Sequence, residues 1–215
     1  MEAALTASCT LPPAPFFMQI LSENSPDFFL TTIHLLSSGS VVIFPTETVY
    51  GLGTLWSNTS GRQRIYELKC RPSDKRLQML AASLEQAAAA GVLVSNSLRK
   101  IADAFWPGPL TVVVPSADGT SIGLRIPAHA FLLRLLQELG EPMAATSANL
   151  SGQAPASTVK EALRSLNGQP DLVIDGGLVS TTAGTASTVV SLLDKRLQIL
   201  REGPITLAQL EACLQ

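Results

Sequence analysis

The stretch KCRPSDKR at residues 69–76 concentrates positive charge in a chain whose formal net charge is only −2. Cations are favoured at the C-terminal end of a helix, and a helix ending here would account for the first of them. Pro72 stops such a helix, so the later cations lie beyond the reach of its dipole. Beside Ser, Thr and Asn donors these side chains suit a polyphosphate, and a nucleotide phosphate is the first hypothesis. The cations are Lys69, Arg71, Lys75 and Arg76.

Hydroxyl-rich segments directly follow two apolar runs. VVIF at residues 41–44 runs into PTETVYG, and MAAT at 143–146 runs into SANLSG. In open α/β sheets ligands bind beyond the carboxyl ends of the strands, so a pocket is expected where these segments meet. The alternative is that Pro45 and Gly152 merely end the strands while Ser, Thr and Asn form local turns.

Conventional catalytic motifs are missing from the sequence. There is no GxxxxGK[ST], HExxH or GxSxG motif, and GLG at residues 51–53 is too weak a signal for a dinucleotide fold. His34 and His129 stand far apart, and we expect neither to act as a base or a metal ligand. The cysteines lack CxxC spacing. P-loop, serine-hydrolase and metal-hydrolase chemistry is therefore excluded, and no dedicated protein metal site is expected.

The elements that must position these residues alternate between short apolar runs and helix-like segments, which is typical of an α/β sheet. Hydrophobic residues make up 46% of the chain and charged residues 15%, a balance that indicates a well-buried core. Residues 110–114 and 122–126 are too close for a parallel crossover, so the sheet is expected to be mixed. The expected strands are residues 41–44, 77–82, 110–114, 122–126, 143–146, 171–174, 187–192 and 197–200.

Helix starts are indicated where Ser or Thr precedes Gln or Glu by three residues. An earlier helix is expected from SPDFF to about Ser37, with Ser25 as its cap. Several prolines before residue 16 indicate a flexible arm over residues 1–24, which leaves residues 25–215 as one domain. The capping pairs are Ser60 with Gln63, Ser83 with Gln86, Thr158 with Glu161 and Thr206 with Gln209.

The sequence favours a protein of the cytoplasm. No apolar run reaches the roughly 18 residues that span a bilayer. The N-terminal stretch carries an acid, Glu2, and lacks the basic region of a secretory signal. We therefore expect a soluble protein without a membrane partner.

The motifs together resemble one family, the YrdC-like threonylcarbamoyl-AMP synthases, in the short form without the extra C-terminal domain. They occur in family order from about residue 30 onward. FPTETVYGLG, PGPLT and SANLSG in one chain form a specific signature. The matching stretches are FPTETVYGLG (44–53), ELKCRPSDK (67–75), FWPGPLTVVV (105–114), GLRIP (123–127), TSANLSG (146–152), STVV (187–190) and LREG (200–203).

This resemblance implies a single α/β domain with a twisted, mixed parallel and antiparallel sheet, flanking helices and a cationic central cavity. It also implies that L-threonine, bicarbonate and ATP give L-threonylcarbamoyl-AMP and pyrophosphate, for the threonylcarbamoyl adenosine of tRNA. Mg²⁺ would accompany the ATP. The implied partners extend to tRNA and to proteins of the modification pathway.

Site residues follow from the matching motifs. The resemblance implies that Lys69 and Arg71 of the KxRP motif are the catalytic cations, and that they bind the ATP phosphates with the help of Lys75. It places L-threonine near Thr46 and Thr48 of PTETVYG, Arg125 of GLRIP and Ser187 of STVV. It assigns the nucleotide to Ser147 and Asn149 of SAN, to Ser187 and to Arg201 of LREG. Because two anions must meet in this reaction, positioning and charge neutralisation should outweigh proton transfer.

Two other interpretations remain open. The first is a noncatalytic module that binds tRNA or double-stranded RNA, in which the basic residues of 62–76 bind the phosphodiester backbone. The scarcity of aromatic residues counts against it, because they make up only 5% of the chain and few are available to stack on bases. The second is a related enzyme that uses carbamoyl phosphate. Such enzymes are usually long chains with added zinc-finger and transferase parts.

Overall fold

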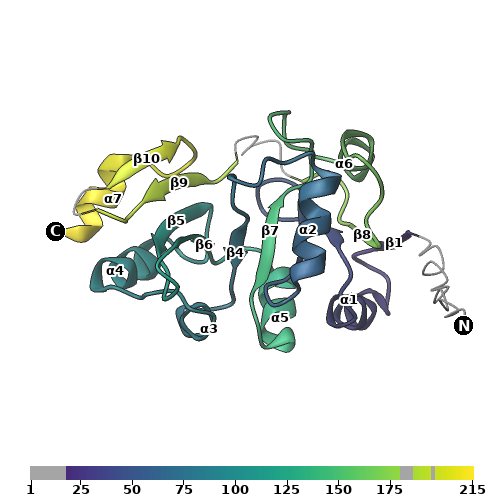
Figure 1. Ribbon diagram of the computed structural model, residues 1–215, viewed down its shortest axis with the longest axis horizontal. Coiled ribbons are helices and arrows are strands. Elements are labelled where there is room, and N and C mark those ends of the chain that lie inside the picture. Colours follow the sequence, from purple (N-terminus) through teal and green to yellow (C-terminus); the bar gives the residue numbers. More distant parts are fainter. Residues whose placement is uncertain (1–17, 180–185, 195–196) are drawn as a thin grey trace, which may run out of the picture.

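The computed structural model describes residues 18–179, 186–194 and 197–215. Within them the strands form a single mixed sheet in the order β1-β8-β2-β3-β7-β4-β6-β5-β9-β10 (Figure 1). Every strand that the sequence predicted lies in this sheet. The strands are β1 (Gln19–Ser22), β2 (Val42–Phe44), β3 (Gly51–Leu55), β4 (Gln78–Leu80), β5 (Leu110–Pro115), β6 (Ser121–Arg125), β7 (Met143–Ser147), β8 (Leu172–Asp175), β9 (Thr188–Ser191) and β10 (Gln198–Arg201).

The mixed character of the sheet is confirmed by its strand pairs. β5 and β6 are antiparallel, as their short connection predicted, and Val113 faces Gly123 across the pair. β4 and β6 run parallel, as do β5 and β9. The motif-bearing strands β2 and β7 both lie antiparallel to β3, which stands between them. β2 and β7 are therefore parallel to each other, and the segments that follow them share one edge of the sheet.

Strand β3 has a sequence that does not indicate a strand, because glycine is depleted in strand interiors. Its glycines are required by a neighbouring ring. A Cβ atom on Gly51 would lie 2.5 Å from Cε2 of Phe44, so only glycine leaves room for the buried Phe44 side chain. The strand is thus specified by contacts with β2 and not by its own propensity.

The prediction that residues 1–24 form a flexible arm is wrong for residues 19–22. These residues form β1, which pairs in parallel with β8, and Gln19 faces Leu172. The side chains of β1 are mostly exposed, so the strand is held by main-chain hydrogen bonds to the edge of β8 and leaves little hydrophobic pattern. The remaining part of the predicted arm, residues 1–17, lies outside the described residues.

Helix starts were predicted correctly at three of the four capping pairs. Ser83, Thr158 and Thr206 cap their helices, and Thr206 with Gln209 forms a complete capping box. The prediction at Ser60 is wrong, because Asn58 caps that helix through a bond from the Gly61 amide. The helices are α1 (Phe28–Ser37), α2 (Thr59–Leu68), α3 (Leu84–Ala89), α4 (Asn96–Phe105), α5 (Ala130–Leu139), α6 (Val159–Ser165) and α7 (Leu207–Leu214).

Ser25 does not cap the first helix either. Its hydroxyl donates to the carbonyl oxygen of Ser22 at 2.8 Å, in a turn that follows β1. The N-cap position of α1 is occupied by Asp27, whose side chain makes no capping bond. The helix therefore begins two residues later than predicted, at Phe28, after the unexpected strand β1 and its turn.

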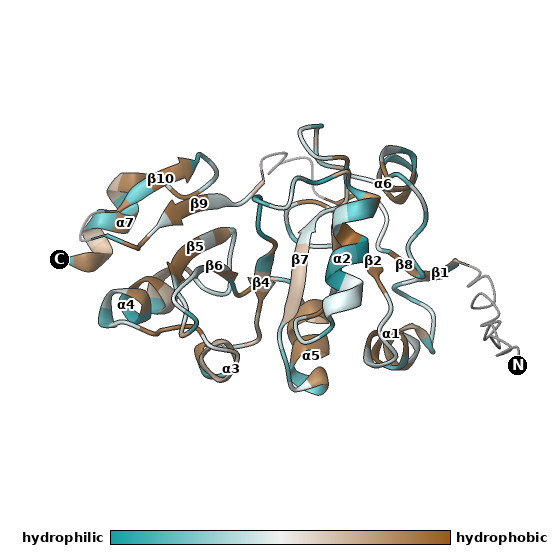
Figure 2. Ribbon diagram, in the orientation of Figure 1, coloured by the Kyte–Doolittle hydropathy of each residue, from teal (hydrophilic) through white to brown (hydrophobic). Residues whose placement is uncertain are grey.

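The helices cover the sheet in three groups. Helices α2 and α6 pack on one face of the β2, β3, β7 and β8 half, and α1 and α5 pack on the opposite face. Helices α3, α4 and α7 cover the half that contains β5, β6 and β9. Brown colour along α5 and β5 marks their hydrophobic residues (Figure 2). Strand β4 joins the two halves, and the candidate site lies at this junction.

Candidate functional site

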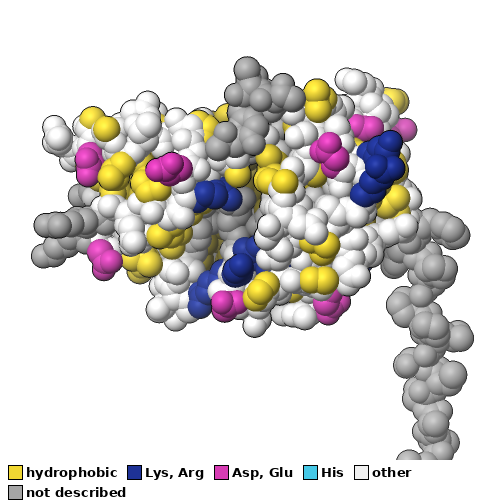
Figure 3. Space-filling view, turned by 90° about the horizontal axis from the view of Figure 1, so that it is seen from above, with side chains coloured by type: hydrophobic (Ala, Val, Ile, Leu, Met, Phe, Trp, Pro, Cys, Tyr) yellow, Lys and Arg dark blue, Asp and Glu magenta, His cyan; other side chains and the backbone are white. Residues whose placement is uncertain are grey.

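Between the two halves of the sheet lies a cavity of about 310 Å³. An adjoining cavity of about 430 Å³ shares several of its lining residues, so the two form one continuous site. Seen from above, Lys and Arg side chains gather around this hollow (Figure 3). The shared residues are Arg71, Ser147, Ala186 and Arg201; Thr48, Thr111, Arg125 and Ser187 line only the first cavity, and Lys69 and Asn149 only the second.

A recess of about 30 Å³ opens beside the first cavity and is walled by the PTET segment. The hydroxyls of Thr46 and Thr48 lie 2.9 Å apart, and Thr46 also donates to the carbonyl oxygen of Val49 at 2.7 Å. Arg125 donates to the Thr48 hydroxyl at 3.2 Å. The two predicted threonines and the predicted arginine therefore belong to one hydrogen-bonded wall. A recess of this size, lined by hydroxyls, suits a short polar side chain.

Glu47 is a site residue that the sequence reasoning missed. Its Oε1 accepts from Nη2 of Arg125 at 2.7 Å and from the Ala128 amide at 2.8 Å. Its Oε2 is buried and has no hydrogen-bond partner among the described residues. A partial signal was available: an arginine in the apolar stretch GLRIP must pair if it is buried, and the E of PTET is one of the few acids within the motifs.

Lys69 is almost completely buried, with 1% of its surface exposed. Its Nζ donates to the carbonyl oxygens of Ser147 and Asn149, and its own carbonyl accepts from the Ser151 amide at 3.0 Å. Lys69 therefore fixes the SANLSG segment at the wall of the second cavity. Burial lowers the pKa of Lys69 to about 7, and the positive charge of Arg71 acts in the same direction.

Arg71 shapes the loop that separates helix α2 from strand β4. Its Nε donates to the carbonyl oxygen of Lys75 at 2.8 Å and its Nη2 to that of Arg76 at 2.9 Å. Burial lowers the pKa of the Arg71 guanidinium. Lys75 is exposed and lines neither cavity, so the structure does not bring it to the other site residues. Arg76, which was not predicted as a site residue, lines the first cavity.

Ser187 and Arg201 form the far wall. The guanidinium of Arg201 donates twice to the Ser187 carbonyl oxygen, at 3.0 Å from Nε and 2.8 Å from Nη2, and to its hydroxyl at 3.1 Å. The Ser187 hydroxyl lies 3.0 Å from that of Thr111. Burial lowers the pKa of Arg201, and repulsion from Arg125 adds to the effect. The site thus holds several incompletely neutralised guanidinium groups, which an anionic ligand would stabilise.

No group of three or more metal-ligating side chains occurs within residues 18–179, 186–194 and 197–215. In the same part of the chain, no helix is long and apolar enough to cross a membrane.

These features define the class: an α/β protein with one twisted mixed sheet and an anion-binding cavity between its halves. The Sua5/YciO/YrdC family, whose description reads "Telomere recombination", matches residues 34–203. A Bacillus subtilis threonylcarbamoyl-AMP synthase is 37% identical over 90% of this chain and 58% of its own length. A Vibrio vulnificus threonylcarbamoyl-AMP synthase is 33% identical over 80% of this chain and 96% of its own length.

A solved structure, P. abyssi Sua5 complexed with L-threonine, superimposes with a TM-score of 0.82 at 31% identity. It covers 92% of this chain, which in turn covers 61% of the P. abyssi chain. The chain belongs to the Sua5/YciO/YrdC family, as its motifs predicted. It spans a little over half the length of the B. subtilis relative and nearly all of the V. vulnificus one.

Proposed function

We propose that this protein synthesises L-threonylcarbamoyl-AMP from L-threonine, bicarbonate and ATP, with release of pyrophosphate. The observation that carries the proposal is one continuous cavity. It is lined by the hydroxyl of Thr48 and by the guanidinium groups of Arg71, Arg125 and Arg201. The names of the B. subtilis and V. vulnificus relatives support this activity, and the L-threonine in P. abyssi Sua5 supports the amino acid substrate.

The reaction joins two anions. The threonine amine and bicarbonate form a carbamate with loss of water. A carbamate oxygen then attacks the α-phosphorus of ATP, the bond from that phosphorus to the bridging oxygen breaks, and pyrophosphate leaves. This chemistry needs positioning and neutralisation of charge more than a protein base, which fits a cavity walled by guanidinium groups and hydroxyls.

Each wall then has a role. Thr46 and Thr48 hold L-threonine in the small recess, with Arg125 and Ser187 on either side. Arg71 and Lys69 bind the ATP phosphates, and Ser147, Asn149 and Arg201 hold the nucleotide in the adjoining cavity. Lys75 joins them if its exposed side chain turns inward. Because no acidic cluster occurs among the described residues, ATP would enter with Mg²⁺ already on its phosphates.

The proposal places the protein in the cytoplasm, in the pathway that makes threonylcarbamoyl adenosine in tRNA, with tRNA and pathway proteins as partners. A purely RNA-binding role is less well supported, because the basic stretch 62–76 is not one surface. Arg64 pairs with Asp171 at 2.5 Å, while Lys69 is buried. Use of carbamoyl phosphate is less well supported, because the B. subtilis and V. vulnificus relatives are named threonylcarbamoyl-AMP synthases.

A pyrophosphate-release assay tests the proposed function. The purified protein should release pyrophosphate from Mg-ATP only when both L-threonine and bicarbonate are present. L-Serine, which lacks the methyl group, should support a lower rate because it loses the contact between that methyl and the apolar residues of the recess. Release that does not depend on threonine would refute the proposed substrate. Salt-sensitive tRNA binding without any turnover would favour the RNA-binding alternative.

Binding of ATP above pH 7 should take up a proton at Lys69. Burial lowers the pKa of Lys69 to about 7, so at about pH 8 most of the free protein carries a neutral amine there. Phosphate groups favour the charged amine and raise its pKa, so the proton is taken up on binding. At about pH 6 the amine is already charged and uptake should nearly vanish.

Calorimetric titrations in buffers of different ionisation enthalpy count these protons. Lys69→Met is the matched variant, since it keeps most of the length of the side chain without its amine. Uptake of the same size in this variant and in the wild type at about pH 8 would contradict the assignment to Lys69.

A further inference from the structure

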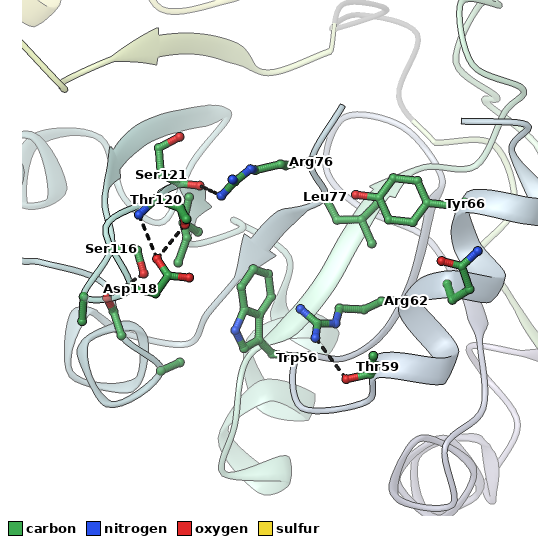
Figure 4. A pocket seen from close by; sticks show the side chains of 15 residues that line it. Trp56, Thr59, Arg62, Tyr66, Arg76, Leu77, Ser116, Asp118, Thr120 and Ser121 are labelled. Carbon is green, nitrogen blue, oxygen red and sulfur yellow. Dashed lines mark hydrogen bonds between the residues drawn. The ribbon is translucent and has the colours of Figure 1, made fainter. Parts of the chain in front are cut away.

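A cavity of about 520 Å³ lies outside the proposed substrate site. It is formed between helix α2 and the hairpin that joins β5 to β6, on the side of the sheet that carries α2 (Figure 4). No step of the proposed reaction uses it. Its volume falls in the range of pockets that bind small organic ligands. The side chains that carry the argument are Trp56, Arg62, Tyr66, Arg76, Asp118 and Thr120.

An aromatic surface and a guanidinium group meet on the α2 side of this cavity. The Arg62 guanidinium carbon lies 5.5 Å from the centroid of the Trp56 ring. Arg62 reaches a protein acceptor only at Thr59, 3.3 Å from Nη2, and its buried Nε has no partner among the described residues. In Figure 4 the Trp56 ring stands between Arg62 and the hairpin, and Tyr66 points in from the next turn of α2.

The hairpin side presents a carboxylate. Asp118 accepts hydrogen bonds from the amide of Thr120 at 2.9 Å and from its hydroxyl at 2.6 Å. These bonds lower the pKa of Asp118, so it stays ionised as an acceptor at neutral pH. Arg76 crosses from the opposite wall, and its Nη1 donates to the Ser121 carbonyl oxygen at 3.3 Å. The cavity therefore offers aromatic rings, two guanidinium groups and one carboxylate that can accept a hydrogen bond from a hydroxyl group of a ligand.

The cavity is also joined to the proposed substrate site through a shared wall. Arg76, Leu77 and Ser121 line both spaces. Arg71 in the substrate site donates to the carbonyl oxygen of Arg76 at 2.9 Å, and the Arg71 amide donates to that of Tyr66 at 2.9 Å. A ligand held by Arg76 and Tyr66 thus sits directly behind the loop that presents Arg71.

We propose that this cavity is a second nucleotide-binding site. The base lies against Trp56 and Tyr66, the phosphate is bound by Arg62 and Arg76, and Asp118 accepts from a sugar hydroxyl. Rings with guanidinium groups suit a base with its phosphate, whereas a single carboxylate is too few for a metal ion. The same chemistry is offered by a free nucleotide and by one unit of an RNA strand. The low aromatic content of the chain does not count against it, because Trp56 and Tyr66 both line this one cavity.

Calorimetry with AMP distinguishes this site from the substrate site. Wild-type protein should bind AMP in two classes of site. Arg62→Gln should weaken one class about tenfold or more and leave threonine-dependent pyrophosphate release unchanged. Arg71→Ala should remove the other class. Arg134→Gln is the matched control, because Arg134 stacks in the same way on a ring, Phe29, at 4.3 Å, far from the cavity in sequence and on another helix.

A short single-stranded oligoadenylate in place of AMP identifies the source of the nucleotide. If the oligoadenylate binds more tightly than AMP and Arg62→Gln weakens its binding, the ligand of this site is an RNA strand. If the oligoadenylate binds no more tightly than AMP, the ligand is a free nucleotide. Trp56→Leu, which removes the ring, should act like Arg62→Gln in either case. The proposal would be overturned if AMP bound to a single class of site and neither Arg62→Gln nor Trp56→Leu changed the affinity for AMP or for the oligoadenylate. Absence of threonine-dependent pyrophosphate release from the wild type would instead count against the proposed function.

Discussion

Replacing Arg71 by alanine should reduce threonine-dependent pyrophosphate release by about 100-fold or more, which is the scale seen when one donor to transition-state charge is removed. Arg71, like Arg201, lines both parts of the cavity, and it lies on the loop between α2 and β4. Its loss leaves the phosphates facing Lys69, whose Nζ is already engaged by two carbonyl oxygens. Initial rates over a range of ATP concentrations measure the effect.

Two further variants separate charge from geometry. Arg71→Lys keeps a positive charge but lacks the planar guanidinium fork that binds two phosphate oxygens at once, so it should recover only a part of the lost rate. Lys75→Ala removes a neighbouring cation that lines neither cavity, and it should leave the rate within a few fold of the wild type. A wild-type rate in Arg71→Ala, with the fold intact by circular dichroism, would refute the role of Arg71.

Replacing Glu47 by alanine should cost both stability and activity. The ion pair between Glu47 and Arg125 is 2.7 Å long and has side-chain exposures of 19% and 5%. Without the carboxylate, Arg125 is left charged and buried, which typically destabilises a protein by about 3 kcal/mol. The Thr48 hydroxyl also loses a fixed donor, so the Michaelis constant for L-threonine should rise.

Urea denaturation and threonine titrations check these two effects. Glu47→Gln is the matched variant, because its amide oxygen still accepts from the Ala128 amide and from Arg125. It should therefore lose less stability than Glu47→Ala. Equal stability of Glu47→Ala and the wild type would show that the pair does not hold Arg125 in place.

The sheet was largely predictable because most of its strands are buried on at least one face and read as apolar runs. Exceptions arise where other segments determine the backbone. Strand β3 depends on Gly51, which makes room for Phe44, and strand β1 is held at the edge of β8 by main-chain bonds. Neither effect leaves a hydrophobic period in the sequence. The sequence also could not show which of several nearby polar residues caps α2, and the structure selects Asn58.

Where a motif matched, most of the predicted site residues line the cavity, and Lys75 is the exception; the hydrogen-bonded pairs could not be predicted. Lys69 was expected to bind phosphates, and in the structure it also donates hydrogen bonds to the carbonyl oxygens of Ser147 and Asn149. Glu47 went unnoticed because no motif role was attached to it. Arg62 was expected to belong to one basic stretch; instead it lies with Trp56 in a separate cavity. Such pairings depend on tertiary geometry, which the order of residues does not reveal.

The most direct measurement is mass analysis of the product formed from ATP, L-threonine and ¹³C-labelled bicarbonate. A cavity that holds the amino acid and the nucleotide together predicts a mixed anhydride of AMP and threonine carbamate that carries the label. Its yield should match the pyrophosphate released, and it should be missing with Arg71→Ala. Pyrophosphate and AMP without any labelled adduct, or the same yield of adduct from Arg71→Ala, would contradict the proposed chemistry.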